Sequence, residues 1–335
     1  MKILYIGNQL SKHGLNKTTI ETLGPNLEKE GFEIYYASSK KRFLFRLLDM
    51  LFTLFKYRNK VSYVLIDTYS TKAFWYAFFC GYLSAIFKIK YIPILHGGDL
   101  PKRLKLNPRI CKKLFSNAYQ NVAPSGFLKK VFEEHGYHNI IYIPNALEIK
   151  HYNFKSRVDY APKIIWVRAF ATIYNPKMAI KVLSRIQKKY PNAQLTMVGP
   201  DKDGSLNTTK KFAQELGVEV NFTGKLSRDQ WLELASNSDF FINTTHFDNT
   251  PVSVMEAMAI GLPVISTNVG GIPYLLTQNQ NAILVNDDDD EQMANVIIDL
   301  LSDNIKCSLL SSNGRKWIEQ LDWEVVKLKW ISVFK

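Results

Sequence analysis

Short apolar runs alternate with longer amphipathic segments along the whole chain. Most positions in each run are apolar, and β-branched and aromatic residues are frequent in them. Continuous apolar strands separated by helices are typical of parallel sheets that helices cover on both faces. The predicted strands are Ile3–Ile6, Glu33–Tyr36, Tyr63–Ile66, Tyr91–Leu95, Asn121–Ala123, Ile140–Ile143, Ile164–Val167, Leu195–Val198, Val218–Phe222, Phe240–Asn243, Pro263–Ser266 and Ala282–Val285.

Twelve strands are too many for one sheet of this kind, and they fall into two similar sets. The polar segment 151–162 separates the sets and is predicted to be the linker between two α/β domains. The length of 335 residues is sufficient for two domains of about 150 residues each. The final stretch, 312–334, has a helical pattern that contains three tryptophans.

The formal net charge of +13 lies entirely in the first half of the chain. Residues 1–150 carry 23 basic and 10 acidic side chains, whereas residues 151–335 carry 20 of each. This asymmetry predicts an anionic partner for the first half, which can be nucleic acid, a membrane surface or an acidic substrate. No groove-reading helix or base-stacking platform accompanies the charge, so we expect no nucleic acid.

Cysteine content and hydropathy predict a cytoplasmic protein. Cys80, Cys111 and Cys307 are few, widely separated and without metal-ligand spacing, which fits a reducing compartment and argues against a zinc site. The uncharged apolar run 73–87 has 15 residues, which is short for a membrane span and typical of a buried helix. The first residues indicate a buried strand rather than a secretory signal.

The segment 43–55 is apolar around most of a helical wheel. A narrow polar stripe on that wheel consists of Arg42, Arg46, Asp49, Thr53 and Lys56. Such a helix is either buried on nearly all sides or seated in a membrane interface, and both interpretations stay open. The basic cluster between 102 and 113 fits anionic lipid head groups or a lipid-diphosphate acceptor, and its alternative is an ordinary solvated face.

The most informative chemical pattern lies in the second half of the chain. Thr250 is predicted to cap a helix that starts at Pro251 and is closed by Gly261. The free amide groups and the positive dipole at its start would bind a phosphate or a sugar hydroxyl. Asp248 and Glu256 flank this helix end, and Glu256 interrupts an apolar segment in which an unpaired carboxylate would be costly.

Two further turns and a family pattern extend this prediction. The turn 268–271 contains two glycines, beside which a ligand could approach the backbone closely. Asp248, Glu256 and the following Ala-Met-Ala-Ile-Gly-Leu-Pro-Val resemble the signature of the family-four glycosyltransferases of the GT-B fold. That signature has two acidic residues separated by seven positions, and its first acid is usually Glu rather than the Asp found here.

The resemblance implies an architecture of two Rossmann-like domains with parallel sheets, flanking helices and an interdomain cleft. It assigns 1–155 to an acceptor- and membrane-facing domain and 160–315 to a nucleotide-sugar-binding domain. The segment 316–335 would be a helix that packs back on the first domain.

The resemblance also implies residues that bind the donor. In the family an Arg after the first strand of the C-terminal domain meets the pyrophosphate, and Arg168 stands in that place. A Lys usually follows about five positions later, but position 173 is Ile, and Lys177 is the nearest candidate. Gly224 lies in a loop similar to the one that passes the base, and Gly14 in a loop similar to the one that faces the phosphates.

The implied catalytic residues are His96, Asp248 and Glu256. Glu256 would bind the ribose, and His96 would lie near the reacting sugar. Asp248 would hold the donor sugar together with the helix start at Asn249, Thr250 and Pro251.

The implied activity is transfer of a sugar from a UDP- or GDP-sugar, with retention of configuration and without a metal or other cofactor. The acceptor would be a glycan or lipid-linked hydroxyl at the inner face of the cytoplasmic membrane, in cell-surface polysaccharide synthesis. An anionic membrane surface would contact the basic N-terminal domain. Two alternatives stay open: a nucleotide-sugar epimerase on the same fold, and a membrane-associated binding protein without activity.

Overall fold

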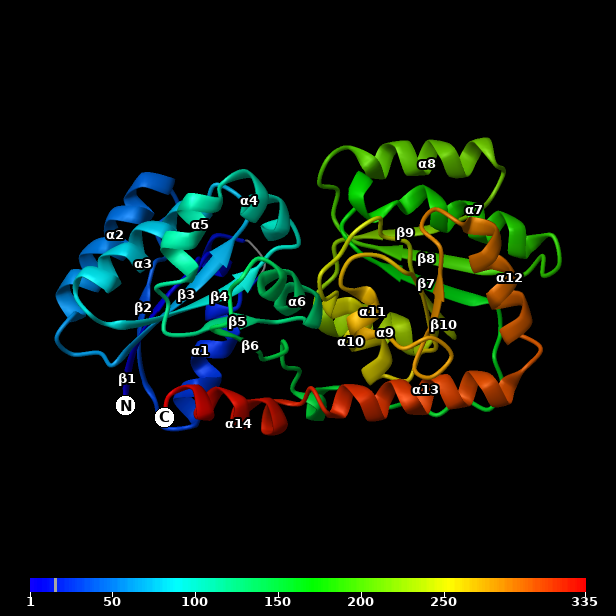
Figure 1. Ribbon diagram of the computed structural model, residues 1–335. Helices are drawn as coiled ribbons and strands as arrows, with labels where there is room; N and C mark the ends of the chain where they lie inside the picture. Colours follow the sequence, from blue (N-terminus) through cyan, green and yellow to red (C-terminus); the bar gives the residue numbers. More distant parts are fainter. Residues whose placement is uncertain (15–16) are drawn as a thin grey trace. The chain divides into compact units, whose positions relative to one another are not determined.

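The chain forms two compact units, each built around one sheet (Figure 1). The computed structural model describes residues 1–14 and 17–335. One unit comprises Met1–Asn145 with Val326–Lys335, and the other comprises Ala146–Val325. Each unit holds a six-stranded parallel sheet flanked by helices, which confirms the predicted pair of Rossmann-like α/β domains.

In the first unit, strands and helices alternate along the chain. Its strands are β1 (Lys2–Ile6), β2 (Glu33–Ala37), β3 (Tyr63–Tyr69), β4 (Lys90–His96), β5 (Asn121–Ala123) and β6 (Ile140–Tyr142). Its helices are η1 (Ser11–His13), α1 (Ile20–Lys29), α2 (Phe43–Tyr57), α3 (Phe74–Ile86), α4 (Leu100–Leu106), α5 (Pro108–Phe115) and α6 (Gly126–Glu134). The last helix, α14 (Trp323–Val333), begins in the second unit, and its later residues belong to the first, where the rings of Phe334 and Phe32 are 5.1 Å apart.

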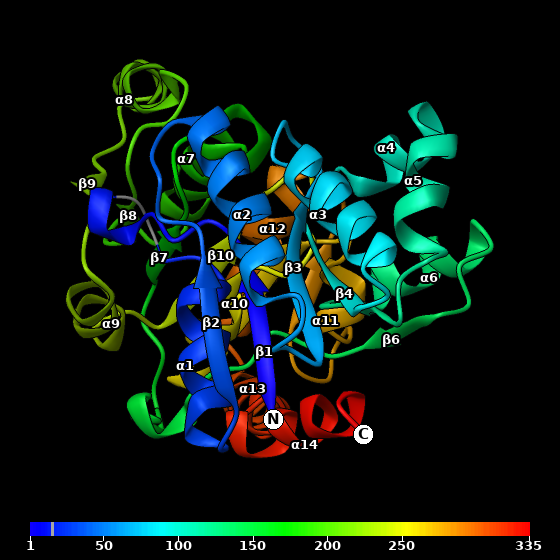
Figure 2. The same ribbon diagram turned by 90° about the vertical axis from the view of Figure 1, so that its left-hand side faces the viewer.

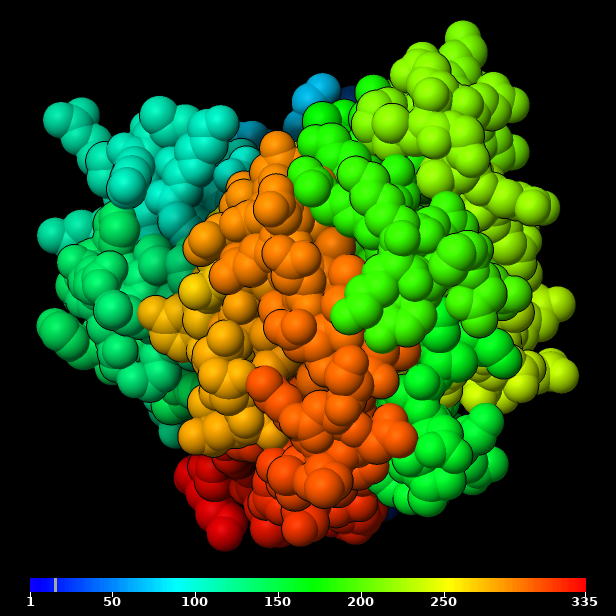
Figure 3. Space-filling model, turned by 90° about the vertical axis from the view of Figure 1, so that its right-hand side faces the viewer, coloured from blue at the N-terminus to red at the C-terminus, as the bar shows by residue number. Residues whose placement is uncertain are grey.

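The second unit repeats this alternation. Its strands are β7 (Lys163–Val167), β8 (Gln194–Val198), β9 (Asn221–Gly224), β10 (Phe240–Asn243), β11 (Val264–Thr267) and β12 (Ile283–Val285). Its helices are η2 (Ile149–His151), η3 (Thr172–Tyr174), α7 (Pro176–Gln187), α8 (Ser205–Glu215), α9 (Arg228–Ser236), α10 (Val252–Ala259), α11 (Ile272–Leu275), α12 (Asp290–Leu300) and α13 (Asn304–Glu319). On the face shown in Figure 3, α12 adjoins α7, and α7 adjoins α8.

Both sheets reverse their direction of growth once. The strand orders are β2-β1-β3-β4-β5-β6 and β12-β11-β10-β7-β8-β9, with all pairs parallel. The reversal lies between β1 and β3 in the first sheet and between β10 and β7 in the second. Connections leave such a point in opposite directions, and the ligands of open α/β sheets bind there, at the carboxyl ends of the strands.

Hydrophobic burial supports both sheets. The buried core of the first unit includes Leu4, Val64 and Phe74, and that of the second includes Trp166, Ile242 and Ile265. Each of these side chains is at most 1% exposed. Such buried apolar surface stabilises a fold by about 25 cal/mol per Å². The strands whose ends carry the site residues are therefore fixed by the packing of the core.

Local chemistry changes two predicted borders. The strand predicted at 218–222 begins at Asn221 instead, because Gly217 adopts a left-handed φ of 66° and the Val218 amide bonds back to Ala213 of α8. The apolar run 73–87 forms α3, but this helix is buried only on one side and exposes Trp75, Phe79, Tyr82 and Ile86. Among the helices of the described residues, none has the length and apolar content needed to cross a bilayer.

Candidate functional site

An arginine and an aspartate meet at the switch point of the second sheet. Arg168 directly follows β7, and Asp248 lies in the loop after the neighbouring strand β10. The two side chains form an ion pair and are only 15% and 16% exposed. Burial lowers the pKa of the Arg168 guanidinium to about 10, which still leaves it cationic at neutral pH. The sheet topology thus joins two predicted site residues 80 positions apart.

Two glycines after β11 hold the Asp248 loop in place. A Cβ on Gly270 would overlap the Asp248 carbonyl, and one on Gly271 would overlap the carbonyl of Asn249. The Gly271 amide donates to the Asp248 carbonyl at 2.7 Å. The chain itself therefore fills the space where a Cβ of these glycines would stand, and the approach of a ligand to their backbone stays a prediction.

The loop also closes on itself through the Asp248 side chain. The Asn249 amide donates to Asp248 Oδ1 at 2.7 Å, so this predicted donor-binding amide already has a partner. Asp248 Oδ1 thereby fixes the turn that leads into α10, while the carboxylate stays paired with Arg168.

The helix α10 starts one residue later than predicted. Pro251 is its N-cap residue with an extended ψ of 113°, so the helix begins at Val252 and Thr250 does not cap it. The reason is that Pro251 itself turns the chain into the helix. The hydroxyls of Thr250 and Ser253 are buried and have no hydrogen-bond partner within the described chain. Together with the amides of the first turn, which lack intrahelical partners, they form a polar surface without a protein partner.

Glu256 lies in the second turn of α10 and is 9% exposed. Its Oε1 accepts a hydrogen bond from the Tyr152 hydroxyl at 2.8 Å, and Arg228 Nε lies 3.6 Å away. The Arg228 guanidinium also covers the Tyr152 ring at 4.5 Å. Burial raises the pKa of the Glu256 carboxyl, and the Tyr152 hydrogen bond and the Arg228 charge act against this shift. The carboxylate is therefore buried but not unpaired.

Gly224 belongs to the same sheet edge, whereas Lys177 lies apart from it. The Gly224 carbonyl accepts from the Gly199 amide at 2.9 Å, and a Cβ on Gly199 would overlap the Arg168 carbonyl. Lys177 is exposed in the first turn of α7, with its ammonium 5.5 Å from the centre of the Phe212 ring of α8.

In the first unit, His96 belongs to a buried polar cluster. It ends β4, and its Nε2 lies 2.9 Å from Oδ1 of Asp67 on the adjacent strand β3. The Tyr5 hydroxyl of β1 donates to the same oxygen at 3.0 Å. Asp67 Oδ2 is buried without a partner among the described residues, and a Cβ on Gly7 would lie 2.5 Å from it. Gly14, in a left-handed turn after η1, has open space around it.

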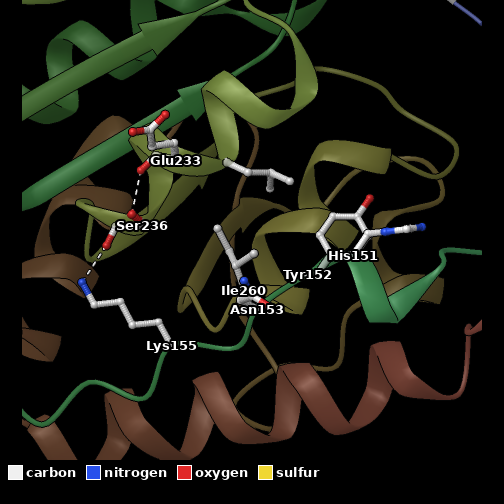
Figure 4. A pocket seen from close by; sticks show the side chains of 8 residues that line it. His151, Tyr152, Asn153, Lys155, Glu233, Ser236 and Ile260 are labelled. Carbon is white, nitrogen blue, oxygen red and sulfur yellow. Dashed lines mark hydrogen bonds between the residues drawn. The ribbon is translucent and has the colours of Figure 1, made fainter.

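A separate cavity of about 270 Å³ opens beside Tyr152 (Figure 4). Its lining is formed by His151, Tyr152, Asn153, Lys155, Leu232, Glu233, Ser236 and Ile260. Lys155 Nζ donates to the Ser236 carbonyl at 2.8 Å, and the Ser236 hydroxyl donates to the Glu233 carbonyl at 2.7 Å. None of the residues predicted for the site lines this cavity, but Tyr152 connects it to Glu256.

The site includes residues that sequence reasoning missed. Tyr152 and Arg228 touch Glu256 from segments far away in the chain, and no motif marks them. Asp67 could have been found from the sequence, because it is an acidic residue near the end of a predicted buried strand, where ligands of parallel sheets bind. The next predicted strand leads to His96. In the part of the chain that the structure describes, no three His, Cys, Asp or Glu side chains gather as a metal site would require.

Comparison with known proteins gives a family match for the second unit. Residues 149–317, half of the chain, match the model of the family described as glycosyl transferases group 1. A GDP-mannose-dependent alpha-(1-6)-phosphatidylinositol monomannoside mannosyltransferase of Mycobacterium tuberculosis is 25% identical over 183 residues, which are 52% of this chain and 47% of that protein. The chain spans less than half the length of the first curated relatives that it matches.

Solved structures show the same fold over nearly the whole chain. Sucrose-phosphate synthase from Thermosynechococcus elongatus has a TM-score of 0.80 at 16% identity, covering 99% of this chain and 98% of that one. Anabaena HepE, in complex with UDP and glucose, has a TM-score of 0.76 at 17% identity, with coverages of 99% and 98%.

Proposed function

The chain belongs to the glycosyl transferases group 1 family, and from this premise we propose that it is a retaining glycosyltransferase. It takes a sugar from a nucleoside-diphosphate donor and places it on a hydroxyl of a lipid-linked or membrane-presented glycan. The observation that carries the proposal is the meeting of Arg168, Asp248 and the start of α10 at one strand switch point.

The diphosphate of the donor is assigned to Arg168 and the first turn of α10. A buried guanidinium and free helix amides both favour an anion at this edge. The structure balances the Arg168 charge with Asp248. A bound diphosphate supplies that balance instead and releases Asp248 for a sugar hydroxyl. The unpartnered hydroxyls of Thr250 and Ser253 are further groups for the donor.

The remaining predicted residues take the roles that the sequence suggested. Glu256 accepts from the ribose hydroxyls, and Tyr152 holds its carboxylate in place until the donor arrives. Gly224 borders the base, and Gly14 leaves room for phosphates in the first unit. His96, oriented by Asp67, contacts the sugar. Because Arg168 and the helix amides neutralise the departing diphosphate, the reaction needs no metal.

The names of relatives and neighbours support a class of donor and a class of acceptor. A relative named as GDP-mannose-dependent and a neighbour bound to UDP support a UDP- or GDP-sugar. The phosphatidylinositol monomannoside in the first of these names supports a lipid-linked acceptor. We place the enzyme peripherally at the inner face of the cytoplasmic membrane, in cell-surface polysaccharide synthesis.

A thermal-shift screen with UDP, GDP, ADP and CMP nucleotides tests the donor site. A ligand that binds only the folded chain raises Tm, so we expect a shift with UDP or GDP. Glu256→Gln keeps the volume of the side chain and should weaken donor binding about tenfold, because a charged hydrogen-bond acceptor is lost. Glu215→Gln, an exposed change in α8, is the control and should leave the affinity unchanged.

Incubation of the best nucleotide sugar with and without lipid-linked glycans then tests the reaction. Transfer of the sugar only when an acceptor is present supports the proposal. An altered sugar on the nucleotide in the absence of acceptor would instead indicate an epimerase. Wild-type donor affinity in Glu256→Gln would contradict the role of this residue.

A further inference from the structure

Helix α2 exposes much more apolar surface than an ordinary surface helix does. Its inward side is formed by Arg46, Met50 and Leu54, and Arg46 belongs to the stripe that is polar on the helical wheel. Its outward side carries large apolar residues, which are Phe43, Leu44, Phe45, Leu48, Phe52 and Phe55. Leu44, Leu48 and Phe52 are 69%, 61% and 66% exposed. Arg46 of the polar stripe is thus buried beside apolar core residues, Arg42 and Lys56 are exposed, and large apolar side chains face the surroundings.

Buried hydrogen bonds of Arg46 hold this orientation. Its guanidinium donates to the Lys40 carbonyl at 2.7 Å, to the Lys41 carbonyl at 2.7 Å and to Asn8 Oδ1 at 2.9 Å. Rolling α2 to hide its apolar side would break these bonds and leave buried polar groups without partners, which costs about 1–3 kcal/mol for each. The exposure of the apolar side is therefore built into the fold.

Helix α3 continues the apolar surface. It packs beside α2, as Figures 1 and 2 show, and the rings of Phe43 and Tyr76 stack at 4.6 Å between them. The exposed row of α3 is formed by Trp75, Phe79, Tyr82 and Ile86, and the helix contains no charged residue. We call the outward residues of α2 and α3 together the α2–α3 face. Contiguous apolar surface of this kind marks an interaction site.

Cations surround the α2–α3 face. Lys40, Lys41 and Arg42 precede α2, and Arg58 at its end lies 4.0 Å above the Phe55 ring. Lys72 and Lys88 flank α3, and α5, which packs against α3, carries exposed Arg109, Lys112 and Lys113. Between positions 50 and 132 the chain has two acidic residues, Asp67, which is buried, and Asp99. The rim of the face is therefore strongly positive.

We propose that the α2–α3 face docks on an anionic lipid bilayer, with its apolar side chains among the acyl chains and its cationic rim at the head groups. Two large apolar partners could cover this face, a lipid bilayer or a second copy of the chain, and the positive charge of the rim distinguishes between them. A second copy of the chain would bring its own positive rim against this one, whereas anionic lipids complement it. The inference goes beyond the sugar transfer, because bilayer binding can be measured without donor or acceptor.

Co-sedimentation of the full chain with vesicles tests this proposal. One set of vesicles contains equal parts of phosphatidylcholine and phosphatidylglycerol, and the other contains phosphatidylcholine alone. We expect binding to the anionic set, and weaker binding to the neutral set and at high salt. Leu48→Gln with Phe52→Gln should lower the partition into anionic vesicles about tenfold, because two apolar side chains no longer enter the lipid.

A matched pair on the second unit provides the control. Ile305 and Leu309 are also four positions apart on one helix, α13, and are 76% and 56% exposed. Ile305→Gln with Leu309→Gln should leave vesicle binding unchanged. All four substituted positions are exposed, so thermal unfolding should match the wild type. Trp75 adds a spectroscopic readout: anionic vesicles should shift the fluorescence emission to the blue, and Trp75→Phe should reduce this shift.

Three results would overturn the proposal. The wild-type chain fails to bind anionic vesicles, or the α2 double variant binds them as well as the wild type does. The third is a wild-type dimer in sedimentation velocity that the α2 double variant turns into a monomer, since the face would then bind a second copy.

Discussion

At the switch point of the first sheet β1 leads into Gly7 and β3 carries Asp67 near its end, whereas the strands of the second sheet lead to Arg168 and the Asp248 loop. Both sheets have six parallel strands and one reversal, so each has one such switch point. In the first unit a carboxylate orients a histidine, and in the second an arginine is paired with an aspartate. The scaffold thus determines where polar groups gather, and the residues at the strand ends determine which chemistry they perform.

The outer helices differ as much as the strand ends do. The first unit carries 25 basic and 9 acidic residues, and the second carries 18 and 21. In the first unit α2 and α3 turn large apolar residues outward. In the second, α7 buries Met178, Val182 and Ile186, and its amphipathic pattern is the usual one. Basic charge and large exposed apolar helix faces coincide in the first unit, which supports the bilayer docking that we propose for it.

The largest effect is expected at Arg168. Arg168→Met should lower kcat/KM by about a hundredfold to a thousandfold, as loss of a group that stabilises developing charge does. It should also destabilise the fold by about 3 kcal/mol, because Asp248 would keep a poorly solvated charge without its partner. Steady-state kinetics and urea unfolding measure the two effects.

The double variant Arg168→Met with Asp248→Asn separates these contributions. Removing both charges should restore most of the stability but not the activity. Recovery of activity in the double variant would mean that Arg168 serves the fold and not the donor.

Asp67 tests the corresponding pair in the first unit. Asp67→Asn should lower kcat by about tenfold to a hundredfold, because His96 loses a charged hydrogen-bond partner. Donor affinity should change much less than kcat, since most of the residues assigned to the donor belong to the other unit. Asp49→Asn, a change in α2 of the same unit, serves as the control. A loss of donor affinity equal to the loss of kcat would show that the first unit contributes to donor binding as much as to the reaction.

Substitution of a single lysine on α5 measures how much electrostatic attraction contributes to vesicle binding by the first unit. Lys112→Gln should weaken binding to phosphatidylglycerol vesicles about fivefold, since each cation near an anionic surface contributes about 1 kcal/mol. The same change of Lys211 on α8 of the second unit should have no effect on vesicle binding. Equal losses for both variants would mean that net charge, rather than the position of the cations, drives the binding.

The smallest effect concerns stability and pH at Glu256. Burial raises the pKa of this carboxyl in the folded chain above its ordinary value of 4.5. The carboxyl therefore stabilises the folded chain below pH 4.5, and this stabilisation is lost as the pH rises through the raised pKa. Glu256→Gln does not titrate. Its free energy of unfolding, relative to the wild type, should therefore be higher at pH 7 than at pH 4. A difference that does not vary with pH, measured by urea unfolding, would contradict the buried state of Glu256.

The sequence pattern predicted all twelve strands, because parallel strands that are buried on both faces leave continuous apolar runs. It also pointed to Arg168, Asp248 and Glu256. The structure pairs the first two at one sheet edge and places the third in the helix that follows. It could not identify Tyr152 or Arg228, because their contacts with Glu256 depend on how distant segments pack. The orientation of α2 was equally hidden, since a wheel shows a polar stripe but not that Arg46 bonds inward to Lys40 and Asn8.

The two glycines behind the Asp248 loop have a consequence for redesign. Main-chain atoms of Gly270 and Gly271 support the loop, and the Asp248 side chain closes it on the Asn249 amide. The side chains of Asn249 and Thr250 can then be exchanged to alter sugar preference while the backbone keeps its path. Gly270 and Gly271 themselves tolerate no such exchange, so a library for new donors should vary the loop and spare its support.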